Sequence, residues 1–484
     1  MFRWLQSVDE RLEATFNRWS WTMFFALMAL FIAVRSAQIC YRPVWFDELS
    51  TYYVSRTFAL VELPYIITHS GDSQPPVYHL LNMPFLWLLG DRPESIRWMS
   101  LTAAVLGLSS TYYWLKRSVS PGAALAAVAF LCASSLAFYS TEARPYAIWF
   151  CFVSLGMATS KLPLRVAFFA AGASVHFFGA VTVLPLALAE QGWRRRLAYL
   201  PILLPAILSV TLAPSIDDMR VKAFTSLDLS LIPHTFAVLA GTILYMFGLP
   251  VALLQRPTDK FRQLIVWAVL LAGGSLGVLL LFTRLAAAFQ PRYCFPLLLA
   301  LALFMAWCVA NSRFPGLLVA AVVLAAMILI PVRAEKSLML SDVPLKNWLL
   351  PYFSQHPYRF VTDSYFFTGL SWHLKQPERS RLYFAYDSPT PFVPRDPRIS
   401  TLGAWVALEQ GEGRIIRLAD LMTPGQPFVY LSFQDHRTKF RLALEKFPVK
   451  ITPLGSFELH ELLLVEPLPQ VSPQSQTGSS TAGP

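Results

Sequence analysis

Two acidic residues, Asp47 and Glu48, stand side by side in a hydrophilic stretch that directly follows a long apolar segment. A carboxylate in such a place can take a proton from an attacking hydroxyl group, or it can help to hold a cation. Ionisable residues at the edge of a membrane are usually functional, so both acids are candidate catalytic residues. The alternative is that they cap a helix in a solvated loop.

A third acid, Glu142, lies in the stretch Tyr139–Tyr146, which also contains Arg144. Glu142 could orient a substrate, and together with Asp47 it could hold a divalent cation, although the sequence requires no metal. The alternative is a surface ion pair between Glu142 and Arg144, which would contribute little to stability.

Two arginines open apolar stretches and could bind an anion. Arg292, which precedes Tyr293, and Arg97 each stand where an apolar segment begins. The planar guanidinium group suits bidentate binding of a phosphate. Either side chain could instead reach to the membrane surface without a further role. Gln74, before a Pro-Pro pair, can offer only a neutral hydrogen bond.

Other polar residues give weaker signals. His176, in a His-Phe-Phe-Gly context, could line a groove or could pack between helices. Asp217 and Asp218 lack further ligands at a telling spacing, so we interpret them as part of a solvated loop. The five cysteines have no metal-binding spacing, and no disulfide framework is expected.

The elements that must position these residues are membrane helices. Of the 484 residues, 55% are apolar and only 14% are charged, and several apolar stretches are long enough to cross a bilayer. Nearly all of the net charge of +11 precedes Glu335 and falls between the apolar stretches. This distribution is typical of cytoplasmic loops and not of a nucleic-acid-binding face. The composition predicts an all-α polytopic membrane protein.

Charge between the spans sets the expected topology. Residues 1–19 predict an amphipathic helix on the cytoplasmic surface, followed by a span from about Trp21 to Ile39 that we interpret as a retained anchor. A large first outer loop covers 40–96. Within it the short, proline-rich piece Pro75–Gly90 is expected to be a re-entrant or surface helix, because a crossing would put the two acidic stretches on opposite sides.

The remaining spans complete the membrane domain, 20–334. They are expected near 97–115, 121–139, 145–160, 163–190 (two short helices that turn near His176), 197–213, 233–254, 261–283, 293–310 and 314–332. The count is about eleven, with the N-terminus in the cytoplasm and the C-terminal region outside.

The composition then changes to that of a small soluble domain. Alternating runs over 335–470 predict an α/β module on the outer face. The expected strands are Arg359–Phe366, Arg381–Tyr386, Phe428–Phe433 and Phe457–Val465, and a helix is expected over Thr438–Lys446. The tail 471–484, rich in Ser, Thr, Gln, Gly and Pro, is expected to be disordered.

Four stretches together resemble the GT-C superfamily of glycosyltransferases, which use polyprenyl-phosphate sugars. In chain order they are Phe46-Asp47-Glu48, Gln74-Pro75-Pro76-Val77-Tyr78, Tyr139–Tyr146 and Pro291-Arg292-Tyr293. The likeness covers about residues 20–330. It is strongest with bacterial relatives of the protein O-mannosyltransferases, glycosyltransferase family 39, and with the lipid A aminoarabinose transferases.

The resemblance implies an inverting glycosyltransferase of the bacterial inner membrane. It would move a sugar from polyprenyl phosphate to a lipid, glycan or protein acceptor on the periplasmic side, with no nucleic-acid partner. Many relatives have a His or Lys at the position of Gln74, where a cation would contact the donor phosphate. Because Gln74 has no charge, the resemblance implies that Arg292 carries more of the phosphate binding. The implied roles are catalysis by Asp47, Glu48 and Glu142, donor-phosphate binding by Arg292, Arg97, Gln74 and Tyr293, and a substrate groove with Arg144, Tyr146 and His176.

Two other classes of protein stay open. A transporter or flippase of lipid-linked sugars would also need charged residues in a polar cavity, but it should place some near the bilayer midplane and often has inverted repeats. A non-enzymatic membrane assembly protein would tolerate changes at Asp47 and would depend on the residues after 335.

Overall fold

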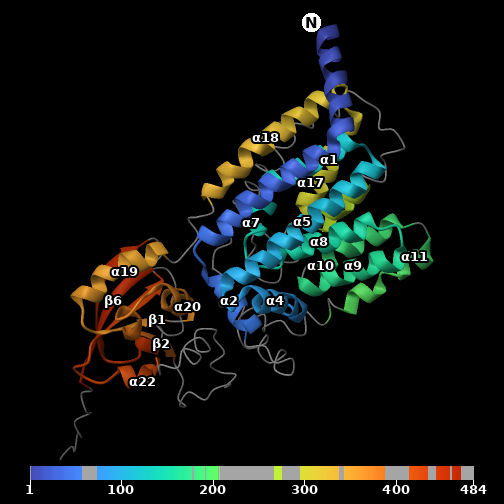
Figure 1. Cartoon of the computed structure of the whole chain (residues 1–484). Helices are drawn as coiled ribbons and strands as arrows, with labels where there is room; N and C mark the ends of the chain where they lie inside the picture. The colour runs from blue at the N-terminus through green and yellow to red at the C-terminus, as the bar shows by residue number, and fades with distance from the viewer. Residues whose placement is uncertain are drawn as a thin grey trace, which may run out of the picture. The chain divides into compact units, whose positions relative to one another are not determined.

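The computed structural model of the chain describes residues 2–56, 74–176, 179–190, 192–204, 207, 266–274, 295–336, 343–362, 364–386, 414–433, 443–457 and 460–469 (Figure 1). The chain divides into two compact units, Met1–Leu340 and Ser341–Pro484. The described part of the first unit is helical, and the second unit contains a β-sheet.

Several helices of the first unit begin at a proline, which suits the first helical turn because no N–H is needed there. The α-helices are α1 Phe2–Tyr41, α2 Phe46–Arg56, α4 Pro76–Leu89, α5 Pro93–Ser118, α6 Pro121–Ala133, α7 Leu136–Tyr139, α8 Tyr146–Ala158, α9 Leu162–Val175, α10 Gly179–Val183, α11 Trp193–Leu197, α17 Pro296–Asn311 and α18 Pro315–Lys336.

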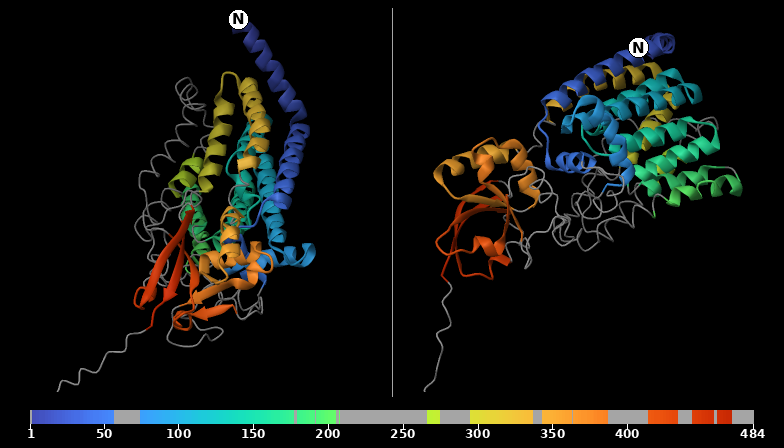
Figure 2. Two further views of the ribbon diagram at one scale, coloured as in Figure 1. Left: turned by 90° about the vertical axis from the view of Figure 1, so that its left-hand side faces the viewer. Right: turned by 60° about the horizontal axis from the view of Figure 1, so that its bottom comes forward.

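The core of this unit is apolar and closely packed. α5 packs against α8, and α6 packs against α17 and α18. The alanines of α6 from Ala123 to Ala129 have no exposed surface, and such small side chains let neighbouring helices approach closely. α1 and α18 lie side by side in every view (Figures 1 and 2).

α1 joins two segments that the sequence predicts as separate helices. The amphipathic stretch 1–19 and the first expected span form one helix that departs from helical geometry at Trp19 (φ −107°, ψ 17°). Asp9, on the amphipathic part, is buried and its Oδ1 accepts the backbone N–H of Leu317 at 2.8 Å. This contact caps the first turn of α18 and ties the start of the chain to it.

The expected span 121–139 is interrupted in the structure. α6 ends at Ala133, and Ser134 takes an extended conformation before α7. Ser134 Oγ donates to the carbonyl of Leu131 and accepts the N–H of Leu136, so the side chain replaces helical hydrogen bonds. The expected turn near His176 is present, because α9 ends at Val175 and His176 is extended.

Two described helices are long and apolar enough to cross a membrane, α1 and Pro315–Val332 of α18. Shorter apolar helices cover Pro121–Ala133, Tyr146–Ala158, Leu162–Val175 and Leu297–Asn311. The expected span 233–254, most of 261–283 and nearly half of 197–213 lie outside the described residues. The count of about eleven spans stays a prediction.

The second unit is built on a six-stranded sheet with the order β3-β2-β1-β4-β6-β5. β1 is parallel to β2 and β4, β2 is parallel to β3, and β6 is antiparallel to β4 and β5. The helices α19 Val343–Gln355, α20 Ser364–His373 and α22 Leu418–Leu421 accompany it. The strands are β1 Arg359–Thr362, β2 Leu382–Tyr386, β3 Ile415–Arg417, β4 Phe428–Phe433, β5 Val449–Phe457 and β6 His460–Pro467.

The expected strands agree with the sheet in part. The strand expected over Phe428–Phe433 is β4. The prediction of one strand over Arg359–Phe366 is wrong beyond Thr362, because α20 begins at Ser364. The helix expected over Thr438–Lys446 lies largely outside the described residues.

Candidate functional site

The two neighbouring acids Asp47 and Glu48 stand in the first turn of α2. The backbone N–H groups of Glu48 and Leu49 each donate to the carbonyl of Trp45 at 3.1 Å. Glu48 Oε2 in turn accepts the N–H of Trp45 at 3.4 Å, which is the acidic half of a capping box. Successive helical residues point about 100° apart, so the two carboxylates face different surroundings.

Glu48 faces inward and has no exposed surface. Its Oε1 accepts from Arg42 Nη2 at 2.8 Å, from Arg97 Nε at 2.9 Å and from the N–H of Ala143 at 3.0 Å. Its Oε2 accepts from Arg97 Nη2 at 2.5 Å. Glu48 therefore joins the start of α2 to α5 and to the turn between α7 and α8.

These contacts also set the protonation state of Glu48. Burial alone would raise its pKa, but the charges of Arg42 and Arg97 and the hydrogen bonds outweigh burial and hold the pKa below its usual value. A carboxylate with a lowered pKa and both oxygens occupied is a poor proton acceptor. This geometry does not support the expectation that Glu48 takes part in the chemical step.

Arg97, like Glu48, makes all its hydrogen bonds within the protein. Its side chain is fully buried, and its remaining N–H groups donate to the carbonyls of Ile39, Arg42 and Pro43 at 3.3, 2.7 and 2.9 Å. With the two bonds to Glu48, all five N–H groups are used. The geometry gives Arg97 a structural role, which argues against the expectation that it binds a donor phosphate.

Asp47 faces a different partner and is partly exposed. Its Oδ2 lies 3.2 Å from Arg144 Nη2, and the side chain of Asp47 is 18% exposed. Arg144 Nη1 also lies 3.4 Å from both the carbonyl of Asp47 and Thr51 Oγ1. The structure thus brings the first acidic stretch to the stretch that contains Glu142.

Glu142 belongs to the same assembly and is completely buried. Ser100 Oγ, on α5, donates to its backbone carbonyl at 2.6 Å. Glu142 is not part of a surface ion pair, because its side chain has no surface exposure. The main-chain contacts of Ser100 and Ala143 fix the turn that carries this acid.

Aromatic rings lie beside that turn. Tyr146 packs on Tyr139 with ring centres 4.7 Å apart, and its ring centre is 5.3 Å from that of His176. His176 is buried and stacks on Trp149 at 4.4 Å with an interplanar angle of 8°. Two of the three groove candidates, Tyr146 and His176, therefore lie in ring contact with each other, whereas the Arg144 side chain contacts Asp47 and Thr51.

Gln74 precedes α4 and is buried. Its Oε1 has no hydrogen-bond partner in the described part of the chain. α4 is held to α2 by polar contacts, with 3.0 Å between Ser55 Oγ and His79 Nδ1 and 3.4 Å between Asn82 Nδ2 and Ser55 Oγ. Gln74 thus precedes a helix that is anchored on the one carrying Asp47.

Two candidates of the sequence analysis, Arg292 and Tyr293, lie outside the described residues, as do the two loop residues Asp217 and Asp218. Phe295, close after the first two in sequence, is buried with its ring centre 5.2 Å from that of Tyr139. No group of three His, Cys, Asp or Glu side chains that could hold a metal occurs in the described ranges. Asp47 and Glu142 by themselves do not make up such a set.

Two buried arginines of this region were not identified from the sequence. Arg42, directly after α1, binds Glu48. Arg35 lies inside the first expected span and donates to Gln38 Oε1 and, at 2.9 Å, to the carbonyl of Ile330 in α18. A charge inside an apolar span marks a structural or functional contact, and this signal could have identified Arg35.

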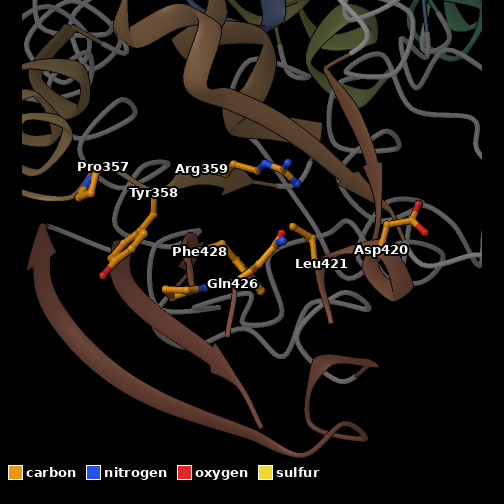
Figure 3. A pocket seen from close by; sticks show the side chains of 8 residues that line it. Pro357, Tyr358, Arg359, Asp420, Leu421, Gln426 and Phe428 are labelled. Atoms are coloured by element: carbon orange, nitrogen blue, oxygen red, sulfur yellow. The ribbon is translucent and has the colours of Figure 1, made fainter. Parts of the chain in front are cut away.

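The second unit contains a cavity of about 240 Å³ (Figure 3). It lies at the start of β1 and β4, beside α22. Arg381 fixes one wall by donating to the carbonyls of Phe353, His356 and Tyr358. The lining residues are Pro357, Tyr358, Arg359, Asp420, Leu421, Gln426, Pro427 and Phe428.

The arrangement of helices and the small mixed sheet have known counterparts. The chain is similar to the crystal structure of ArnT from Cupriavidus metallidurans bound to undecaprenyl phosphate, with a TM-score of 0.51 and 12% sequence identity over 91% of this chain and 97% of that chain. ArnT in the apo state matches with a TM-score of 0.51 and 13% identity over the same shares. No protein-family model and no curated protein sequence matches.

These matches show the fold alone, and the chain has an ArnT-like fold. The resemblance predicted from the four sequence stretches is confirmed at this level. The solved structure that shares the fold is ArnT, in forms with and without undecaprenyl phosphate.

Proposed function

We propose that the chain is an inverting glycosyltransferase that moves a sugar from a polyprenyl-phosphate donor to an acceptor hydroxyl group. The observation that carries this proposal is the pairing of Asp47 with Arg144 in an ArnT-like fold. ArnT itself crystallises bound to undecaprenyl phosphate, which supports a lipid phosphate as the donor carrier here.

The chemical step is a single displacement. The acceptor oxygen attacks the anomeric carbon, the bond from that carbon to the phosphate oxygen breaks, and the polyprenyl phosphate leaves with the bonding electrons. Asp47 takes the acceptor proton as general base. Arg144 at 3.2 Å orients the carboxylate of Asp47. One displacement without a covalent enzyme intermediate inverts the anomeric configuration.

Other residues bind the substrates in this proposal. Glu142 supports the site from the turn next to Arg144, and Tyr146 and His176 border the groove. Arg292 and Tyr293 remain proposed donor-phosphate ligands, and Gln74 a weaker one because it carries no charge. Glu48 and Arg97 hold the site together, since their polar atoms are occupied within the fold.

The proposed setting is the bacterial inner membrane. The first unit would form the membrane domain, 20–334, with about eleven spans and a cytoplasmic N-terminus. The α/β domain, 335–470, would lie in the periplasm, followed by a disordered tail. The acceptor would be a lipid, a glycan or a protein.

The test is transfer of radiolabelled sugar from undecaprenyl-phosphate-linked donors to membrane extracts by the purified full-length chain. We expect labelled acceptor and released undecaprenyl phosphate in equal amounts. Movement of the intact donor across proteoliposomes without transfer would favour a lipid-linked sugar transporter. Absence of both activities, with a cellular requirement for the second unit alone, would favour an assembly protein.

A further inference from the structure

Arg42 has buried donors that the fold leaves unused. It follows the last residue of α1, is 3% exposed, and donates from Nη2 to Glu48 Oε1 at 2.8 Å. Its guanidinium carbon lies 5.2 Å from the ring centre of Phe138. Its Nε and Nη1 are buried and have no hydrogen-bond partner in the structure as described.

The contrast with Arg97 is informative because both arginines bind the same carboxylate. Arg97 donates all five N–H groups, three of them to main-chain carbonyls. Arg42 uses one atom and, among the described residues, leaves Nε and Nη1 without an acceptor. The two arginines that bind Glu48 thus differ in one respect: the described part of the fold supplies acceptors for all N–H groups of Arg97 but not for all those of Arg42.

A buried donor without an acceptor destabilises the folded protein, and more so when the group is charged. Such a group in a native structure calls for an explanation, for example an ion or a ligand. The acceptor that best matches a guanidinium group is an anionic oxygen, above all that of a phosphate.

We propose that Arg42 binds the phosphate of the polyprenyl-phosphate donor, an inference that rests on the proposed function. Arg42 stands at the end of the first expected span, which is the depth at which the head group of a membrane lipid lies. A donor anchored by its polyprenyl chain can therefore bring its phosphate to this residue. Phe138 covers one face of the guanidinium plane, so the N–H groups at its edge remain for the phosphate.

The experiment measures binding of undecaprenyl phosphate to the purified full-length chain in detergent, by isothermal titration and by the shift in melting temperature. Arg42→Lys keeps a cation next to Glu48 and removes the Nε and Nη1 donors, and Arg42→Gln also removes the charge. We expect about ten-fold weaker binding for Arg42→Lys, since loss of one charge-assisted hydrogen bond is sufficient for that factor. The loss for Arg42→Gln should be larger.

The matched control is Arg56→Lys on α2. Arg56 is 44% exposed and pairs with Asp91 at 2.7 Å, so its replacement should leave binding unchanged. Equal binding by the unchanged chain, Arg42→Lys and Arg42→Gln would overturn the assignment while the proposed function stands. No binding of undecaprenyl phosphate to the unchanged chain would overturn both.

A second measurement needs no variant and covers the case in which both replacements unfold. Hydrogen–deuterium exchange of the unchanged chain, read by mass spectrometry, should slow in the peptide around Arg42 when undecaprenyl phosphate is added. Undecaprenol, which lacks the phosphate, should have less effect. Equal exchange with both lipids would contradict the role of Arg42.

Discussion

The backbone N–H of Ala143 donates a 3.0 Å hydrogen bond to Glu48, 95 residues earlier in the chain. This bond joins the turn that carries Glu142 to the first turn of α2, and the pairing of Asp47 with Arg144 lies beside it. Glu48 therefore acts as the residue that positions its neighbour Asp47, and both arginines around it depend on its charge.

Replacing Glu48 by Gln should destabilise the protein strongly. The change leaves Arg42 and Arg97 buried without their carboxylate, and breaking a buried pair in this way costs about 3–5 kcal/mol. The measurement is the melting temperature in detergent. Glu466→Gln is the control, because its pair with Lys450 is exposed and surface changes stay within about 0.5 kcal/mol. Similar melting temperatures for both variants would contradict the role of Glu48.

The lowered pKa of Glu48 predicts a pH dependence of stability. A group whose pKa is lower in the folded state stabilises the protein above its unfolded pKa, about 4.3 for a glutamate, and this contribution is lost as the pH falls below that value. The melting temperature of the unchanged chain should therefore fall more steeply below about pH 4.3 than that of Glu48→Gln. Parallel curves for the two proteins would contradict the assignment.

Close packing of α5 and α9 on α8 makes a prediction for two glycines, Gly107 on α5 and Gly172 on α9. A Cβ on Gly107 would lie 2.5 Å from the ring of Phe150 and 3.0 Å from the Cα of Cys151, whereas one on Gly172 would meet Phe152 at an ordinary 3.4 Å. Gly107→Ala should cost about 1–3 kcal/mol through overpacking. Gly172→Ala serves as the control in the same melting experiment, and a larger loss for this control would count against the described packing.

The contact of Asp9 with α18 predicts that the amphipathic start of α1 stabilises the first unit. Asp9→Ala removes the acceptor for the N–H of Leu317, and loss of such a cap costs about 0.5–2 kcal/mol. Glu10→Ala, at an exposed neighbouring position, should have little effect. Equal melting temperatures of the two variants would show that the cap contributes nothing.

The sequence alone predicted the helical character of the first unit and placed two distant acidic stretches on the same side of the expected membrane domain. Charge between the apolar spans put Asp47 and Glu142 on one side, and the structure joins their segments through Arg144. The different surroundings of Asp47 and Glu48 could not be predicted, because they depend on which side of α2 meets Arg97 and Ala143.

Other differences have local causes. The run from Ser364 is short and apolar, and such a run suits a strand or a buried helix equally well. Tertiary packing selects α20 there. The position of Arg35 inside an apolar span is a signal in the sequence, but the acceptors of Arg35 and Arg42, the carbonyl of Ile330 and Glu48, come near them only in the folded chain.

The most direct test of the central claim compares sugar transfer by the unchanged chain and by Asp47→Asn, with undecaprenyl phosphate binding measured on the same preparations. The amide cannot take a proton, so we expect transfer to fall by about 10²–10⁴-fold, with donor binding and melting temperature retained. Glu466→Gln should transfer sugar at the unchanged rate. Transfer by Asp47→Asn at the rate of the unchanged chain would contradict the account.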